Sequence, residues 1–69
     1  MAAITYTKAD WIAEADIKPL PGGHFQGIVQ VAHSGGADAS QHLADAASES
    51  PEEALEEAKA LAHRILADL

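Results

Sequence analysis

Residues 22-GGHFQGIVQVAHSGG-36 form an alternating segment between two glycine pairs. Phe25, Val29 and Val31 share one parity of this segment, and polar side chains take most of the other parity, with Ile28 as the exception. Such alternation is typical of a β-strand with one buried face. Glycine pairs permit the positive φ angles of chain reversals. The sequence therefore predicts a strand bounded by two turns.

The residues after this strand are expected to return beside it. The turn-forming segment 34-SGGADAS-40 separates 24–34 from a weaker apolar pattern over 40–48. In the second segment Leu43 and Ala47 fall on one side. We therefore expect 24–34 and 40–48 to form a hairpin, with Leu43 and Ala47 facing the core.

Residues 8–18 fit either a strand or a short helix. Their apolar and polar side chains alternate as in a strand, whereas Thr7 with Asp10 resembles a helix capping box. A strand is favoured because the apolar positions form no helical stripe and 19-PLPGG-23 is a natural connection into the next strand. The preceding 4-ITYT-7 is either a further short strand or a lead-in to the first.

The C-terminal segment 50-SPEEALEEAKALAHRILADL-69 predicts an amphipathic helix. Ser50 is suited to the N-cap, Pro51 to the first helical position, and Glu53 completes a capping box. Apolar residues then recur at i, i+3, i+4 and i+7, which gives one buried stripe. We expect a continuous helix from Pro51 to Asp68, with the acidic run on its solvated side.

These elements predict one α+β domain over residues 1–69, a three-stranded antiparallel β-meander with one C-terminal helix packed on one face (βββα). Alanine is abundant but fills little volume, so the core should depend on the aromatic and branched side chains. The expected core residues are Trp11, Ile17, Phe25, Val29, Val31, Leu43, Leu55, Ala58, Leu61, Ala62 and Ile65.

Size and charge limit the functions of the chain. It has 69 residues and a formal net charge of −7. Nucleic acid and membrane are not expected partners, because anionic phosphates are bound largely through Lys and Arg. A short chain without cysteine has a thin core and no disulfide, so a homodimer is an expected way to bury more surface. The first residues have the pattern of neither a basic n-region nor an apolar h-region, and no apolar run is long enough to span a membrane, so we expect a cytoplasmic protein.

Histidines provide the only pattern that suggests a metal site. His24, His33 and His42 recur every nine residues, and a hairpin could bring His33 and His42 to one metal ion, with Asp38 or Asp45 as a third ligand. The alternative is that they are solvated residues on a sheet. It is favoured because no spacing fixes the pair on a rigid element. We assign no metal-binding residue and expect no cofactor.

An enzyme is not expected. Nucleophilic catalysis needs a base beside the nucleophile and a third orienting group, and phosphate-binding loops need a defined glycine spacing before a helix. The serines have turn or cap contexts, and His63 suits the C-terminal end of the helix dipole. We therefore assign no catalytic or cofactor-binding residue. The serines concerned are Ser34, Ser40, Ser48 and Ser50.

The strand 22-GGHFQGIVQV-31 followed by 50-SPEEALEEAKALA-62 resembles the sheet and helix of the HicB-like antitoxin domain, over roughly residues 21 to 63. It is similar also to small bacterial proteins built as βββα. The resemblance implies a regulatory role, as an antitoxin fragment that pairs with a basic toxin through its acidic surface. The chain lacks the Pro-Gly-Cys loop and the DNA-binding segment of that family, and no residue role is carried over.

The face of the sheet away from the helix remains open in the expected fold. Ile12, Leu20 and Ile28 fall on it, and apolar side chains on an open face indicate self-association or a protein partner. The expected function is a non-catalytic protein-interaction or regulatory module. Its alternatives are the HicB-like antitoxin fragment and a weak metal-binding protein that uses His33 and His42.

Overall fold

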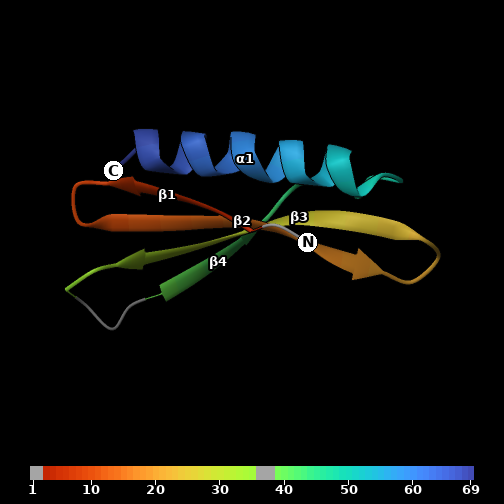
Figure 1. The fold of residues 1–69 in the computed structure, drawn as a ribbon, viewed down its shortest axis with the longest axis horizontal. Coiled ribbons are helices and arrows are strands. Elements are labelled where there is room, and N and C mark those ends of the chain that lie inside the picture. The colour runs from red at the N-terminus through yellow and green to blue at the C-terminus, as the bar shows by residue number, and fades with distance from the viewer. Residues whose placement is uncertain (1–2, 36–38) are drawn as a thin grey trace.

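One antiparallel sheet with a helix along one face makes up the molecule (Figure 1). The computed structural model describes residues 3–35 and 39–69. The strands follow each other across the sheet in chain order, β1-β2-β3-β4. The α+β class, the antiparallel meander and the C-terminal helix are therefore confirmed, but the sheet has four strands instead of three. The elements are β1 (Ile4–Lys8), β2 (Trp11–Leu20), β3 (His24–His33), β4 (Ala39–Leu43) and α1 (Pro51–Ala67).

The additional strand is β1, which contains the ITYT segment. It forms a hairpin with β2, in which Ile4 lies opposite Ala15 and Lys8 opposite Trp11. A two-residue turn joins the strands, and Ala9 in this turn has a φ of 52°. Residues 11–20 are all extended, so the strand interpretation is confirmed and the short helix is excluded.

The turn between β2 and β3 is the one that the first glycine pair predicts. Gly22 and Gly23 have φ angles of 85° and 79°, a region that side chains rarely adopt. Gly35 does not have a positive φ, so this part of the turn prediction is wrong. Its neighbour Gly36 lies outside the described residues.

The fourth strand is shorter than expected, and the parity predicted for it is wrong. β4 ends at Leu43, and Val29 of β3 lies opposite His42. Residues directly opposite each other share a face, so His42 is on the side of the helix and Leu43 is on the open face, with 51% of its surface exposed. Ala47, the other expected core residue, is also exposed. A register shift by one residue exchanges the two faces of a strand, and the weak alternation of 40–48 could not fix it.

Both ends of α1 are closed by side chains. Ser50 is the N-cap, and its Oγ accepts a hydrogen bond from the Glu53 N–H at 3.4 Å. The same hydroxyl donates to Glu52 Oε1 at 2.8 Å, which lowers the pKa of Glu52. At the other end, Lys8 Nζ donates to the Leu66 carbonyl oxygen at 2.7 Å. The predicted helix and its cap are confirmed, and Lys8 ties the last turn to β1.

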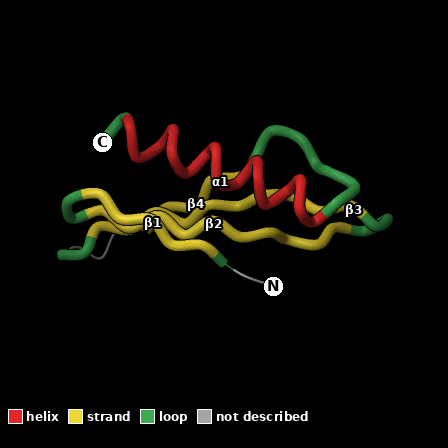
Figure 2. Tube along the Cα trace, turned by 45° about the horizontal axis from the view of Figure 1, so that its top comes forward, coloured by secondary structure: helices red, strands yellow, loops and turns green. Residues whose placement is uncertain are grey.

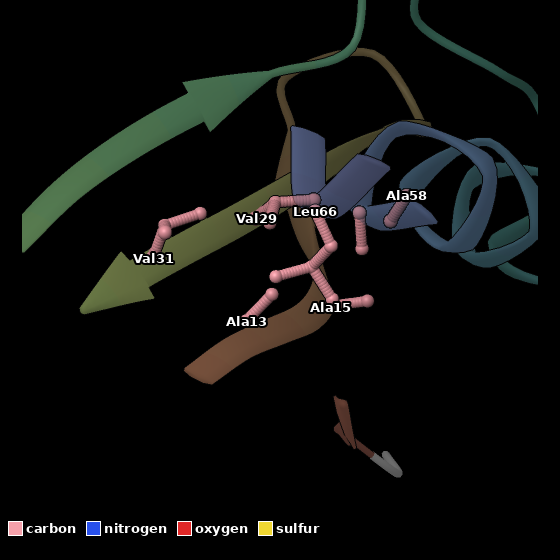
Figure 3. Packing of buried hydrophobic residues seen from close by; sticks show 7 residues of the cluster. Ala13, Ala15, Val29, Val31, Ala58 and Leu66 are labelled. Carbon is pink, nitrogen blue, oxygen red and sulfur yellow. The ribbon is translucent and has the colours of Figure 1, made fainter. Parts of the chain in front are cut away.

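The helix runs along one face of the sheet (Figure 2). It lies close to the sheet because small side chains line both surfaces. An Ala ridge of α1, Ala54, Ala58 and Ala62, is fully buried. It lies on β2 and β3, and a Cβ placed on Gly27 would be 2.6 Å from the Ala54 carbonyl oxygen. Figure 3 shows the surrounding cluster, in which valine, leucine and alanine side chains meet. The buried cluster consists of Ala13, Ala15, Val29, Val31, Ala58, Ala62 and Leu66.

The largest side chains flank this interface instead of filling it. Trp11 and Leu61 are half-buried against the cluster, and Phe25 is half-buried outside it. Phe25 has the predicted parity, and its backbone forms a bridge to Ser48. The core therefore depends on Val29 and Val31 as expected, but not on Trp11 and Phe25, because small side chains occupy most of the close contact between the helix and the sheet. Of the other expected core residues, Ile17, Leu55 and Ile65 are half-buried.

Candidate interaction surface

The sheet keeps the histidines apart. His42 lies opposite Val29, and His33 is four residues further along β3, which is about 13 Å. His24 lies at the other end of β3. Among residues 3–35 and 39–69, no group of three His, Asp or Glu side chains could hold a metal ion. The pairing that would let His33 and His42 share a metal does not form, and Asp38, one suggested third ligand, lies outside the described residues.

Two histidines pack against aromatic rings. The His33 ring meets the edge of Trp11, with ring centroids 4.8 Å apart. His63 of α1 lies 4.5 Å from the ring of Tyr6 on β1, so it joins the helix to the first strand. These ring contacts give His33 and His63 a structural role in packing.

Ser40 and His42 form the only hydrogen-bonded serine–histidine pair among the described residues, with Oγ and Nε2 3.1 Å apart. They lie two residues apart on the same face of β4, and the described hydrogen bonds give His42 no carboxylate to orient its ring. The remaining serines have structural contacts. Ser48 bonds to the backbone of Phe25, and the Ser34 N–H bonds to the Asp10 carbonyl oxygen. None of these arrangements has the three groups of a nucleophilic site.

The acidic part of α1 is a solvated helix face. Glu52, Glu53, Glu56 and Glu57 are exposed. Glu56 forms a salt bridge of 2.8 Å with Lys59 one turn later, and this contact raises the pKa of Lys59. The face lies opposite the buried Ala ridge, as the helical spacing predicts.

The opposite face of the sheet is divided by charge. The register places Ile28 beside Leu43, and Ala32 beside Ala39, on the face that α1 does not cover. Glu14, Asp16 and Lys18 lie on the β2 half of this face. By contrast, the sequences of β3 and β4 contain no Asp, Glu, Lys or Arg. The charged residues of the open face therefore lie on β2, and β3 and β4 contribute none.

The outer edge of β2 is blocked where β1 ends. β1 pairs with β2 only up to Ala15, and no strand among residues 3–35 and 39–69 pairs with the outer edge of Asp16–Leu20. Backbone groups of successive residues point alternately to the two sides of a strand, so Ile17 and Pro19 point to this edge. The Ile17 N–H donates to Asp16 Oδ1 at 2.8 Å, and proline has no N–H. An added strand would find no free N–H donor there.

The outer edge of β4 has no such protection. The Ala44 N–H donates to the Gly27 carbonyl oxygen at 2.9 Å, which places the even-numbered residues on the side of β3. Ala39, Gln41 and Leu43 therefore direct their N–H and C=O groups outward. β4 is the last strand of the sheet and contains neither proline nor charge. Natural edge strands usually carry a proline or a charged side chain that prevents pairing with another strand, so this edge is suited to pairing.

The sequence interpretation found part of this surface. Ile12, Leu20 and Ile28 lie on the open face as predicted, and Ile12 is 38% exposed. It missed Leu43, which was placed in the core, and the outward backbone of Gln41. The uncharged composition of the two strands was the available signal.

No helix of the described residues is long and apolar enough to cross a membrane. The chain matches no protein-family model, and no curated protein or solved structure shows significant similarity to it.

Proposed function

We propose that the chain is a non-catalytic protein-interaction module that receives an extended protein strand along the outer edge of β4. One observation carries the proposal: no described residue pairs with this edge, which has neither charge nor proline, while the outer edge of β2 beyond Ala15 is blocked by Asp16 and Pro19. The contrast within one sheet favours β4 as the edge at which a strand can be added.

Strand addition would use both the backbone and the side chains of this region. The outward N–H and C=O groups of Ala39, Gln41 and Leu43 supply the hydrogen bonds that give such complexes their affinity. Leu43, which is 51% exposed, lies next to Ile28. A partner side chain beside Leu43 would extend this apolar contact, and it would select which strand binds.

The charge distribution supports the same location. The chain carries a formal net charge of −7, and binding over charged side chains requires their desolvation. On β3 and β4 a partner meets amide, alanine and aliphatic side chains instead. Contact at this half of the sheet therefore avoids that cost.

Photo-cross-linking in cells tests this proposal. Replacing Leu43 by p-benzoylphenylalanine should give a discrete cross-linked product, whereas the same residue at the exposed position of Glu57 on α1 should not. Adding Gln41→Pro should abolish the product, because it removes an outward N–H and leaves the hydrogen bonds to β3 in place. A product that is equally strong from position 57, or that persists in the Gln41→Pro variant, would contradict the proposal.

A further inference from the structure

We infer that the strand added to β4 is β4 of a second copy of this chain, antiparallel to the first around a two-fold axis at Gln41. The inference rests on the proposed function and names its partner. It would join two four-stranded sheets into one continuous sheet of a homodimer.

The backbone of β4 fits this symmetric pairing. Ala39, Gln41 and Leu43 point outward, so a two-fold axis at Gln41 pairs Ala39 with Leu43 of the second copy and Gln41 with its own equivalent. These are three hydrogen-bonded positions of an antiparallel ladder, which together supply about six backbone hydrogen bonds. An axis at Ser40 would pair only Ala39 with Gln41, and an axis at His42 only Gln41 with Leu43, so each gives two hydrogen-bonded positions within β4 instead of three.

The side chains on the open face become continuous in this register. Leu43 lies beside Ile28 within its own sheet, and the two-fold axis places Ala39 of the second copy on its other side. The same row then continues to Ala32 and Ile12 of the second copy. An exposed leucine thus gains apolar neighbours on both sides, while Gln41 meets Gln41 at the axis.

Electrostatic repulsion restricts where two copies can meet. Each carries a formal net charge of −7, so contact is least unfavourable where charged side chains are absent. The sequences of β3 and β4 provide such a surface. α1 lies over β2 and β3, so the two acidic helices would be four strand spacings apart, roughly 19 Å. Salt screens exposed charges over about 8 Å at physiological ionic strength, so the helices would repel only weakly.

The other edge of the sheet is less suited to a second copy. β1 is also short, but the edge beyond its end is blocked by the Asp16 side chain and by Pro19. The adjoining open face carries Glu14 and Asp16, whose charges two copies would bring toward each other. Pairing through β1 is therefore an outcome that the experiment must distinguish.

Sedimentation equilibrium of the purified chain, from about 1 µM to about 1 mM, tests the inference. A seam of five-residue strands is smaller than a standard interface, so we expect a dimer with a Kd on the order of micromolar. Gln41→Pro should weaken association at least about tenfold. The matched control is Thr5→Pro, which removes an outward N–H from the outer edge of β1 and should leave the Kd unchanged.

Amide exchange locates the seam independently. Raising the protein concentration should slow exchange of the Ala39, Gln41 and Leu43 amides and leave the Thr5 and Thr7 amides unchanged. If Gln41→Pro does not fold, Leu43→Glu replaces it, because this side chain is exposed and the new carboxylates add repulsion beside the seam. Thr7→Glu, an exposed position on the same face but on β1, is its control.

The outcomes separate the inference from the proposed function. The β4 homodimer is overturned if the chain remains monomeric at every concentration. It is also overturned if Thr5→Pro weakens dimerisation and Gln41→Pro does not. If a monomeric chain still cross-links from position 43 to a different protein, the module stands and its partner is another protein. A monomeric chain without any cross-link from position 43 refutes both.

Discussion

Replacing Gly27 by alanine tests the close contact between α1 and the sheet. The new Cβ would lie 2.6 Å from the Ala54 carbonyl oxygen, 3.0 Å from the Ala58 nitrogen and 3.1 Å from the Ala58 Cβ. Two of these atoms belong to the helix backbone and cannot rotate away. To reach ordinary contact the helix must move outward by somewhat less than about 1 Å, and a gap of this size forfeits a quarter to a half of each van der Waals contact beside it.

The expected cost of Gly27→Ala follows from this movement. Overpacking of a core costs about 1–3 kcal/mol. We expect a cost near the upper end of this range, because the movement also loosens the packing of the fully buried Ala54, Ala58 and Ala62. Replacing glycine in a strand recovers about 0.5–1 kcal/mol through the unfolded chain. The free energy of unfolding should therefore fall by about 2 kcal/mol, a large part of the roughly 3–5 kcal/mol available to a domain of this size.

Urea denaturation followed by the fluorescence of Trp11, the only tryptophan, measures this loss. Gly35→Ala is the matched control, because a Cβ there would meet only His33 ring atoms at 3.9 Å and the backbone φ is not positive. This control should unfold within about 0.5 kcal/mol of the wild type. Equal stability of Gly27→Ala and Gly35→Ala would show that the helix does not lie against β3 at this point.

Three further changes test the ends of the elements, each measured by thermal or urea unfolding. Ser50→Ala should cost about 1 kcal/mol through loss of the N-cap. The Ser50 hydroxyl lowers the pKa of Glu52, so their hydrogen bond stabilises the fold above the unfolded-state pKa of Glu52 and is lost as the pH falls through its folded-state pKa. The free-energy cost of Ser50→Ala should therefore be smaller in acid, and a larger cost in acid would contradict this. Lys8→Met should cost about 1 kcal/mol by removing the cation at the Leu66 carbonyl, and equal stability would exclude this cap. Ala9→Asn should raise stability by about 0.5 kcal/mol, because asparagine tolerates the φ of 52° better than alanine.

The elements could be predicted from the sequence wherever one local pattern determined them. The cap at Ser50 and Pro51 with its helical stripe fixed α1, and the alternation around Val29 fixed β3 and its buried face. The sequence did not decide whether β1 is a strand, because ITYT is only four residues long and so short a strand is stable only when it pairs with a neighbour.

The core was assigned correctly only in part, because packing distance is not a local property. Val29, Val31, Ala58 and Ala62 are buried as predicted, but side-chain volume suggested that the core also depends on Trp11 and Phe25. Gly27 instead lies under the Ala ridge of α1, so the helix packs close enough to the sheet for alanine side chains to fill the space between them. The aromatic side chains then lie at the margins of this contact. The spacing of the small residues in α1 is consistent with such close packing, but the packing distance becomes evident only when α1 and β3 are placed together.

The interaction surface depends on register, which the sequence left undetermined. A shift by one residue in β4 would bury Leu43 and direct the backbone of Ser40 and His42 outward, where the same edge would present a polar pair. The observed register instead exposes Leu43 beside Ile28 and directs the Gln41 backbone outward. The Ala44 to Gly27 hydrogen bond and the bridge between Phe25 and Ser48 extend this pairing beyond β4. The same contacts that hold the chain after β4 beside β3 therefore determine which backbone groups and side chains the outer edge of β4 presents to a partner.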